Sequence, residues 1–295
     1  MELLIDKVRF AEHAQAAGLP IPATFIIRTR EDAGAAAAGL DFPVVLKPGV
    51  KSPTWLAGTT RRAFVVGSPT ELVERYAEIE AWTSALIAQT WVDGAATRLY
   101  SFNGYFDRAS VPQATFVARK IRQWPPETGT SSLGEEIRDD EVLAASLRLF
   151  ESVGYRGLCY LEMKRDPRTD AALIIEPNIG RPTGRSAIAE RGGVELLLTA
   201  YRDALGEALP EARTQTFRGV KWIYLRHDLQ SALHEIRLGR LTPLGWIRSI
   251  RGPKTEAVGD WRDPVPFVGD LRHALAAAIR SASVRLRRGK RTRAA

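Results

Sequence analysis

Residues 157–185 read GLCYLEMKRDPRTDAALIIEPNIGRPTGR, and this stretch decides the fold. It predicts two strands, Leu158–Lys164 and Ala171–Glu176, joined by a turn-forming run of aspartate, proline, arginine and threonine. Each strand carries one carboxylate, Glu162 on the first and Glu176 on the second. The predicted hairpin therefore brings the two carboxylates side by side.

Asn178 adds a third oxygen donor next to this pair. It follows Glu176 by two residues, and alternate side chains of an extended strand leave the same face. Two carboxylates and an amide oxygen make an all-oxygen site, which suits Mg²⁺ held together with substrate phosphates. The sequence thus predicts a metal site formed by Glu162, Glu176 and Asn178.

The alternative is that the two glutamates lie on the solvated face of the hairpin and pair with Lys164 or Arg165. The run at residues 171–175 is apolar throughout, which is typical of a strand buried on both faces. A charge at the end of such a strand needs a partner, and a metal ion would provide one.

Length and composition place the chain among soluble globular proteins of about two domains. It has 295 residues, of which 45% are hydrophobic and 26% charged. No apolar run approaches the roughly 18 residues that a membrane span needs, and the N-terminus lacks the pattern of a signal peptide. The single cysteine, Cys159, excludes an internal disulfide and favours a reducing, cytoplasmic location.

The net charge of +8 is concentrated at the C-terminus. Residues 285–293 contain six basic residues and no acid, which leaves +2 for the preceding chain. We therefore expect a nearly neutral folded body and a solvated, partly disordered tail at residues 285–295. Binding of nucleic acid or of an anionic membrane by this tail is the less favoured interpretation.

Lys47 ends a second apolar strand, in the run FPVVLKP at residues 42–48. A lysine that follows three apolar residues and precedes a proline is poorly placed for solvent. An anionic partner such as a phosphate is therefore expected. Residues 49–61 contain glycine, serine and threonine, and they could cover such phosphates.

The order of these features resembles the ATP-grasp superfamily. The matches are, in chain order, Lys7 in IDK, Lys47 in FPVVLKP, a loop from Lys51 to Arg61, LIAQTWVDG at residues 86–94, Glu162 in CYLEMKRD, and Glu176 with Asn178 in IIEPN. The matched region covers about residues 3–205. The combination in this order is more specific than any single motif.

The resemblance implies an α+β fold in which two α+β subdomains clasp a nucleotide. Residues 1–84 would form the N-terminal subdomain, and residues 85–209 the C-terminal subdomain with the metal site. Residues 210–284 would form a small C-terminal α/β extension before the basic tail. This extension is similar to tails of predicted ATP-grasp carboxylate–amine ligases.

The resemblance also implies how the cofactors would bind. Mg²⁺, with Mn²⁺ as the alternative, would lie between the predicted metal site and the phosphates of ATP. Lys47 would contact the phosphates, and the backbone of residues 89–92 would contact adenine. The cofactor-binding residues would be Lys7, Lys47, Gln89, Thr90, Trp91 and Val92.

The implied activity is that of a ligase that joins a carboxylate to an amine through an acyl phosphate, with amino acids or peptides as expected substrates. Such phosphoryl transfer depends on positioning and charge neutralisation rather than on a protein nucleophile. Guanidinium groups suit the planar anions involved. The candidate catalytic residues are Arg119, Arg122, Arg181 and Arg185. Arg181 is the strongest of these candidates. The alternative to a catalytic role is that Arg181 forms an ion pair with Glu190 or Glu195.

ATP-grasp enzymes usually begin with a further nucleotide-fold-like domain, whereas this sequence starts at the next subdomain. A partner chain or a missing segment would supply that domain, or the protein works without it. Two other functions stay open. One is a nucleotide-binding module that needs such a partner for turnover, and the other is an ATP-grasp kinase that stops at phosphorylation.

Overall fold

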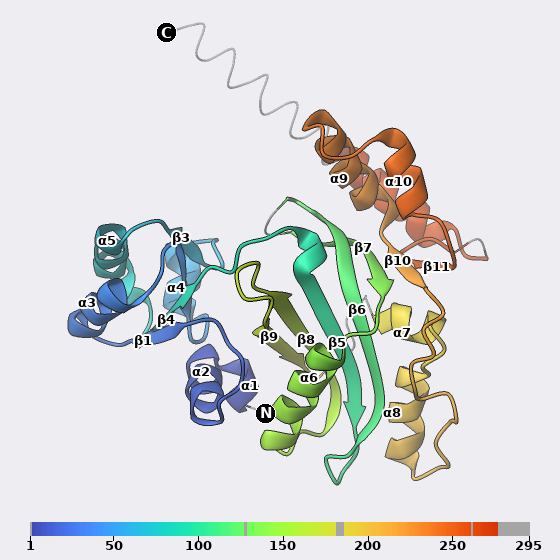
Figure 1. Ribbon diagram of the computed structural model, residues 1–295, viewed down its shortest axis with the longest axis horizontal. Helices are drawn as coiled ribbons and strands as arrows, with labels where there is room; N and C mark the ends of the chain where they lie inside the picture. The colour runs from blue at the N-terminus through green and yellow to red at the C-terminus, as the bar shows by residue number, and fades with distance from the viewer. Residues whose placement is uncertain (1, 127–128, 181–185, 261, 277–295) are drawn as a thin grey trace, which may run out of the picture.

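The computed structural model describes residues 2–126, 129–180, 186–260 and 262–276. Two β-sheets, one of four and one of seven strands, form the centres of two α+β lobes that face each other (Figure 1). The small lobe contains the N-terminal part of the chain, and the large lobe contains the rest. The α+β architecture predicted from the sequence is therefore confirmed.

The small lobe is an antiparallel sheet in the order β1-β4-β2-β3. Its strands are β1 (Thr24–Ile27), β2 (Val44–Pro48), β3 (Phe64–Val66) and β4 (Leu86–Thr90). One face is covered by α3 (Arg30–Gly39), α4 (Pro53–Gly58), α5 (Pro69–Ile79) and the 3₁₀ helix η1 (Glu80–Trp82). Helix α4 lies within the stretch that the sequence predicted as a loop over phosphates.

Local sequence explains how these helices start. Helix α5 begins with Pro69, which suits the first turn because its missing N–H would have no partner there. The hydroxyl of Ser68 accepts the N–H of Glu71 at 3.2 Å and caps the helix. The helix then buries Leu72 and Tyr76 in the core of the small lobe.

Helix α2 (Lys7–Ala16) covers the opposite face of the small sheet, behind the short helix α1 (Glu2–Ile5). Its residues Val8 and Ala11 pack on Ile87 of β4. This face of the small sheet is turned toward the large lobe, so α2 lies between the two lobes (Figure 1).

The large sheet has the order β11-β10-β7-β6-β5-β8-β9, and only the β10–β11 pair is parallel. Its strands are β5 (Leu99–Phe106), β6 (Pro112–Trp124), β7 (Thr130–Glu136), β8 (Gly157–Arg165), β9 (Ala172–Ile179), β10 (Lys221–Ile223) and β11 (Lys254–Glu256). The 3₁₀ helix η2 (Ala96–Arg98) leads into β5.

Helices cover both faces of this sheet. Helix α6 (Asp140–Ser152) buries Phe150 against Phe102 and Phe106 on one face. Helices α7 (Ala187–Arg191) and α8 (Leu196–Leu205) pack on the other face. The second face carries the candidate site beyond these two helices.

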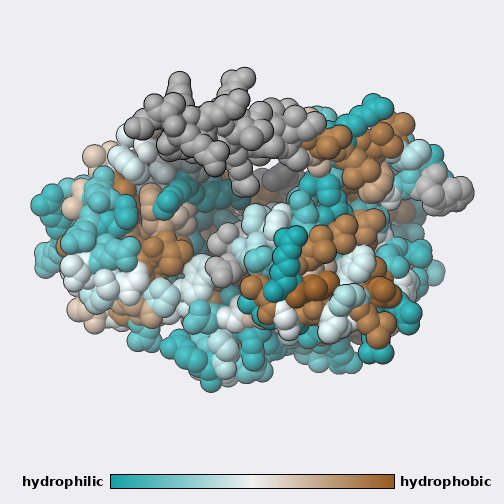
Figure 2. All heavy atoms as spheres, turned by 90° about the horizontal axis from the view of Figure 1, so that it is seen from above, coloured by the Kyte–Doolittle hydropathy of each residue, from teal (hydrophilic) through white to brown (hydrophobic). Residues whose placement is uncertain are grey.

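The C-terminal extension continues the large sheet through β10 and β11 and adds α9 (Leu225–Arg237), α10 (Pro243–Ser249) and a helical stretch at residues 265–276. Figure 2 shows apolar side chains gathered on the half of the surface that contains this extension, whereas the surface of the small lobe is more hydrophilic. The exposed apolar residues of α9 are Leu225, Leu229 and Leu233.

Two of the predicted domain limits differ from the sheet boundaries. Strand β4 pairs with β1 and β2, so the small sheet extends past the predicted limit at residue 84. Strands β10 and β11 belong to the large sheet, so the predicted unit at 210–284 shares a sheet with the region before it. The predicted tail at 285–295 lies outside the described residues. None of the described helices is long and apolar enough to cross a membrane.

Candidate functional site

The β8–β9 hairpin places Glu162 directly opposite Glu176, and Tyr160 opposite Asn178. Residues directly opposite in an antiparallel pair share a face, with Cβ atoms about 4.5–5.5 Å apart. A register shift follows Glu162, because Met163 pairs with Ile174 and skips one residue. The hairpin thus brings the two carboxylates and the amide to one face.

Lys7 reaches this face from the first turn of α2. The carboxylate of Asp6 accepts the N–H groups of Val8 at 2.8 Å and of Arg9 at 3.3 Å, which caps the helix. The N–H of Lys7 itself donates to the Gly49 carbonyl at 3.1 Å. These bonds fix the backbone of Lys7, and its Nζ lies 3.1 Å from Oε1 of Glu176.

Lys47 and Gln89 come from neighbouring strands of the small sheet, on the face that α2 covers. Lys47 Nζ donates to Gln89 Oε1 at 3.2 Å, and Gln89 Nε2 donates to the hydroxyl of Thr24 at 3.0 Å. Burial lowers the pKa of Lys47. The carboxylate of Glu176 opposes this effect, and the neighbouring charge of Lys7 adds to it.

A cavity of about 290 Å³ lies between the two lobes, where these groups meet. Its apolar wall comes from α1, α2, the edge strand β9, Ile21 and Ile87 of β4. Its polar lining is Lys7, Lys47, Gln89, Glu176 and Asn178. All five were predicted as site residues from the sequence, although they are up to 171 positions apart in it.

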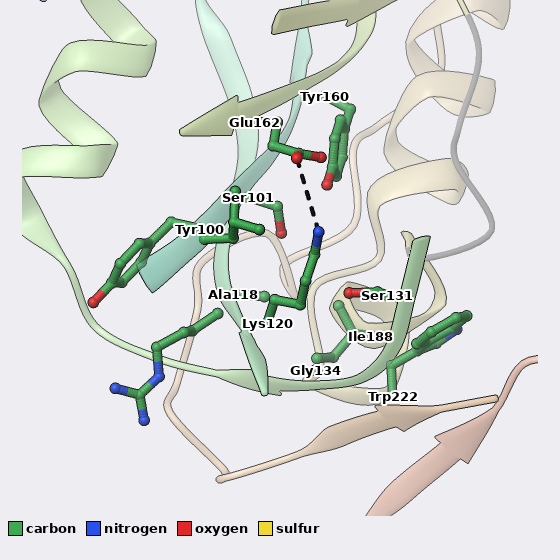
Figure 3. Close-up of a pocket in the computed structure, with 12 residues that line it drawn as sticks. Tyr100, Ser101, Ala118, Lys120, Ser131, Gly134, Tyr160, Glu162, Ile188 and Trp222 are labelled. Atoms are coloured by element: carbon green, nitrogen blue, oxygen red, sulfur yellow. Dashed lines mark ion pairs between the residues drawn. The ribbon is translucent and has the colours of Figure 1, made fainter. Parts of the chain in front are cut away.

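Lys120 is a site residue that the sequence analysis missed. The residue is 7% exposed, and its Nζ lies 3.8 Å from Glu162 Oε1 and 3.0 Å from Gln123 Oε1. Figure 3 shows its ammonium group pointing toward Glu162. The run ARKIR at residues 118–122 contains the cations Arg119, Lys120 and Arg122. Only the register of β6 decides which of them faces Glu162. Strand alternation separates Arg119 from Lys120, but it does not tell which of the two faces Glu162.

The structure separates Arg119 and Arg122 from the carboxylate pair. Arg119 lies opposite Tyr100 in the β5–β6 ladder, whereas Ser101 lies opposite Glu162, so Arg119 projects from the other face of the sheet. There it forms an ion pair with Glu135. Both arginines stay predictions as catalytic residues.

Arg122 is held by the C-terminal extension. Its Nε and Nη2 each donate to the carboxylate of Asp228 at 2.8 Å, and Nη1 donates to Ser249 at 2.9 Å. Asp228 is fully buried and also accepts the indole N–H of Trp246 at 2.9 Å. The other two candidate arginines, Arg181 and Arg185, lie outside the described residues.

The predicted adenine contacts, residues 89–92, join the two lobes. The N–H groups of Thr90 and Trp91 donate to the carbonyls of Ala23 and Pro43, each at 2.9 Å. Within the described residues, the N–H of Val92 has no backbone carbonyl as a partner. Of the N–H groups of Thr90, Trp91 and Val92, that of Val92 can therefore donate to a ligand. Trp91 also lies under Lys164 of β8, with Nζ 5.6 Å from the ring centroid.

The side chain of Thr90 lies on the other face of β4 from Gln89. Thr90 pairs with Val44, which is part of the core of the small lobe. Its hydroxyl is buried and has no hydrogen-bond partner in the described part of the chain. Only the backbone of Thr90 is therefore available for the predicted contact.

The residues present fit a magnesium ion bound together with phosphate. No group of three or more His, Cys, Asp or Glu residues is placed to hold a metal within the described ranges. The predicted set instead supplies two carboxylates on one face and an amide oxygen beside them. Mg²⁺ is usually held by one or two carboxylates, with waters and substrate phosphates completing its octahedron.

Comparison of sequences finds ligases. The chain is similar to the D-alanine–D-alanine ligase of Stutzerimonas stutzeri, with 28% identity over 216 residues that cover 69% of this chain and 66% of the relative. It is also similar to the D-aspartate ligase of Enterococcus faecium, with 25% identity over 197 residues that cover 63% of this chain and 46% of the relative. No protein-family model matches the chain.

Comparison of structures finds the same two-lobed fold. The N5-carboxyaminoimidazole synthetase of Staphylococcus aureus has a TM-score of 0.57 and 15% identity, over 72% of this chain and 53% of that one. The biotin carboxylase domain of the Hydrogenobacter thermophilus 2-oxoglutarate carboxylase, in complex with MgADP, has a TM-score of 0.55 and 18% identity, over 72% and 48% of the two chains.

Two facing α+β lobes, with lysines on one and carboxylates on the other, define the ATP-grasp fold. The chain shares this fold with the solved structures, and its sequence is similar to those of the two ligases. It spans between 46% and 66% of the length of the curated relatives it matches.

Proposed function

We propose that the protein is an ATP- and Mg²⁺-dependent ligase that joins a carboxylate to an amine. The observation that carries this proposal is the cavity between the lobes, where Lys7 and Lys47 face Glu176 and Asn178. Cations from one side and oxygen donors from the other are what a metal-bound polyphosphate requires. The similarity to D-alanine–D-alanine ligase and D-aspartate ligase supports the same reaction class.

The residues of this chain bind and orient the reactants. Glu162, Glu176 and Asn178 hold Mg²⁺, which neutralises phosphate charge when it is bound. Lys7 and Lys47 contact the phosphates. Burial lowers the pKa of Lys47, and a phosphate anion beside it would favour its charged form.

The chemistry has two steps. A carboxylate oxygen forms a bond to the γ-phosphorus of ATP while the bond from that phosphorus to the β–γ bridging oxygen breaks, and ADP leaves. The amine nitrogen then forms a bond to the acyl carbon, phosphate leaves, and the nitrogen loses a proton. A site that excludes water and holds preorganised charges is sufficient for both steps.

The finer parts of the proposal follow from the same chemistry. Mn²⁺ suits the same oxygen donors and is the proposed alternative metal. Arg181 is the proposed contact for the acyl phosphate, together with Arg119 and Arg122 as the weaker candidates. Amino acids or peptides are the proposed substrates, and a further domain or partner chain would complete their binding. A cytoplasmic location is proposed because the substrate ATP is found there.

The proposal is tested by ADP release from Mg-ATP in a pooled screen of carboxylates and amines that includes D-alanine and D-aspartate. Stimulation by a particular acid–amine pair, lost in Glu176→Gln and retained in the exposed-surface control Glu12→Gln, is the expected result. ADP release that is unchanged in Glu176→Gln would contradict the metal assignment. A phosphorylated acid that accumulates and resists added amine would favour a kinase instead.

A further inference from the structure

Helix α9 of the C-terminal extension exposes apolar residues and buries polar ones. Its buried residues include Asp228, which is fully buried, and Ser231. Its exposed apolar residues are between 38% and 45% exposed, and their spacing of four positions places them on one face of the helix: Leu225, Leu229 and Leu233. A surface helix of a globular protein usually has the reverse arrangement. The outward face of α9 therefore carries leucines that an apolar partner would remove from water.

The helical stretch at residues 265–276 has the same inverted arrangement. Its half-buried residues include Phe267, Asp270 and Ala274, and their helical spacing places them on one face. On this face the carboxylate of Asp270 accepts from Arg226 of α9 at 2.6 Å. The exposed apolar residues of the stretch are Val265, Val268, Leu271 and Leu275. The stretch thus turns its ion pair toward α9 and four apolar side chains toward solvent.

Helix α10 belongs to the same group of helices. Its Trp246 donates to Asp228 of α9 at 2.9 Å, as Arg226 of α9 donates to Asp270, so polar bonds join the three helices. Helix α10 exposes Leu244 and Ile247. We call the exposed apolar residues of these three helices the apolar surface of the extension. Figure 2 shows apolar side chains gathered on this half of the molecule, and such a gathering is typical of an interaction site.

The charges around the apolar surface are predominantly positive. Every acid within residues 220–276 accepts a hydrogen bond inside the chain: Asp228, Glu235, Glu256, Asp260, Asp263 and Asp270. Five exposed cations of the same range form no ion pair with another described residue: Arg237, Arg248, Arg251, Lys254 and Arg272. Residues 277–295 add seven cations and no acid to the sequence. The complementary partner is therefore both apolar and anionic.

A membrane that contains anionic phospholipids has both properties, since its acyl chains accept leucines and its headgroups attract cations. A second copy of the chain would bring the same unpaired cations to the interface. Nucleic acid would neutralise the cations but leave the leucines in water. The acidic helix of another protein would cover one groove, whereas the apolar residues here come from three helices. Charge and apolar area together thus favour the membrane.

We propose that the C-terminal extension docks the protein on an anionic membrane surface. The apolar surface of the extension enters the headgroup region, and the surrounding cations contact lipid phosphates. The extension lies at the β11 edge of the large sheet, whereas the cavity between the lobes lies at the β9 edge. Docking through the extension would therefore leave the cavity open to its ligands.

Co-sedimentation of the full chain with lipid vesicles tests this proposal. The vesicles contain either phosphatidylcholine alone or an equimolar mixture of phosphatidylcholine and phosphatidylglycerol. We expect binding to the anionic vesicles and much weaker binding to the neutral ones. Raising the salt concentration from about 0.1 M to about 0.5 M should weaken the binding, because it screens the attraction between cations and headgroups.

Matched variants locate the docking surface. Leu229→Ser combined with Leu233→Ser should raise the apparent lipid Kd at least about tenfold, because two apolar side chains no longer leave water. The control is Leu197→Ser combined with Leu205→Ser in α8, where the leucines are 42% and 56% exposed and lie outside the extension. It should bind vesicles as the unmodified chain does.

Two further variants complete the test. Val268→Ser combined with Leu275→Ser changes the same apolar surface in the stretch at residues 265–276, and it replaces the α9 variant if that one does not fold. Deletion of residues 285–295 removes six cations and should weaken binding to anionic vesicles. Unchanged thermal unfolding of each variant shows that a loss of binding does not come from a loss of the fold.

Four outcomes would overturn the proposal. The chain does not bind anionic vesicles at low salt, or it binds neutral and anionic vesicles equally. The leucine variants bind as the unmodified chain does, which would assign any binding to the cations alone. Sedimentation equilibrium without lipid shows a dimer that Leu229→Ser with Leu233→Ser dissociates, which would assign the apolar surface to a second copy. None of these measurements uses ADP release, so each outcome leaves the proposed ligase function to its own test.

Discussion

Glu162 and Glu176 lie directly opposite each other across the β8–β9 ladder, and each is contacted by a lysine from a different lobe. Lys7 of the small lobe reaches Glu176, and Lys120 of the large lobe reaches Glu162. Two like charges on one face of a sheet repel each other unless cations lie nearby. We propose that a metal cation binds between the two carboxylates.

The first prediction concerns this pair. Glu162→Gln and Glu176→Gln should each raise the Mg²⁺ concentration needed for half-maximal ADP release by about tenfold or more, because each removes one charge from the metal site. The double variant should lose less than the product of the two single effects, since both residues act through one ion. Independent, multiplicative effects would show that the two carboxylates do not share a metal.

Lys47 should be required for nucleotide affinity. Lys47→Met removes a cation from the cavity and should weaken ATP binding by roughly tenfold to a hundredfold, as expected for a lost charge-assisted contact. Isothermal titration calorimetry with the non-hydrolysable analogue measures this directly. Lys254→Met, at an exposed position on β11, is the control and should bind the analogue normally.

Gly49 sets the distance between β2 and the start of α2. A Cβ at this position would meet Cγ2 of Val8 at 2.9 Å and the carboxylate of Asp6 at 3.1 Å. Gly49→Ala should therefore displace the cap of α2, and with it Lys7, and weaken binding of the ATP analogue. Gly34→Ala is the matched control. It adds a Cβ to the exposed side of α3 with nothing within 4 Å, and should stabilise the fold by roughly 0.5–1 kcal/mol.

The buried pair of Arg122 and Asp228 should contribute mainly to stability. Asp228→Ala leaves a buried guanidinium without its anion and should lower the free energy of unfolding by about 3–5 kcal/mol, as measured in urea. Replacing both partners, in Arg122→Met with Asp228→Leu, should recover part of that loss. If the double variant is fully stable and yet inactive with every acid–amine pair, the catalytic prediction for Arg122 gains support.

Acid should loosen the helical stretch at residues 265–276. Asp270 in this stretch accepts from Arg226 at 2.6 Å and from the Tyr224 hydroxyl at 2.6 Å. These bonds, chiefly the one from Arg226, lower the pKa of Asp270 from 3.8 to about 2. A carboxyl whose pKa is lower in the folded state than in the unfolded state stabilises the fold at every pH above its unfolded-state pKa. This stabilisation is lost as the pH falls toward the folded-state pKa.

The expected result is a difference between the unmodified chain and Asp270→Asn in the free energy of unfolding. This difference should be constant above about pH 5 and should shrink between pH 4 and pH 2. The exposed Asp263→Asn serves as the control. A difference that grows as the pH falls would contradict the assigned ion pair.

Local sequence was sufficient for the parts of this protein that depend on neighbouring residues. The spacing of Glu176 and Asn178 determined that both leave one face, because strand alternation has a period of two. The strand that ends at Lys47 and the capped start of α5 are equally local features. The order of such motifs along the chain was enough to predict the ATP-grasp fold.

Other features depended on which strands pair and in which register, and these are decided by contacts between distant residues. The run ARKIR contains three cations, and no local signal tells which of them faces Glu162. The ladder from β6 through β5 to β8 turns Lys120 toward it, turns Arg119 to the opposite face, and leaves Arg122 to pair with Asp228 of the extension.

The sequence by itself therefore determined the class of fold and the candidate oxygen donors, since strand period and motif order depend on neighbouring residues. The tertiary structure decided which cations meet those donors. The physical reason is that a one-residue change of register would turn every side chain of β6 to the other face without altering its local sequence.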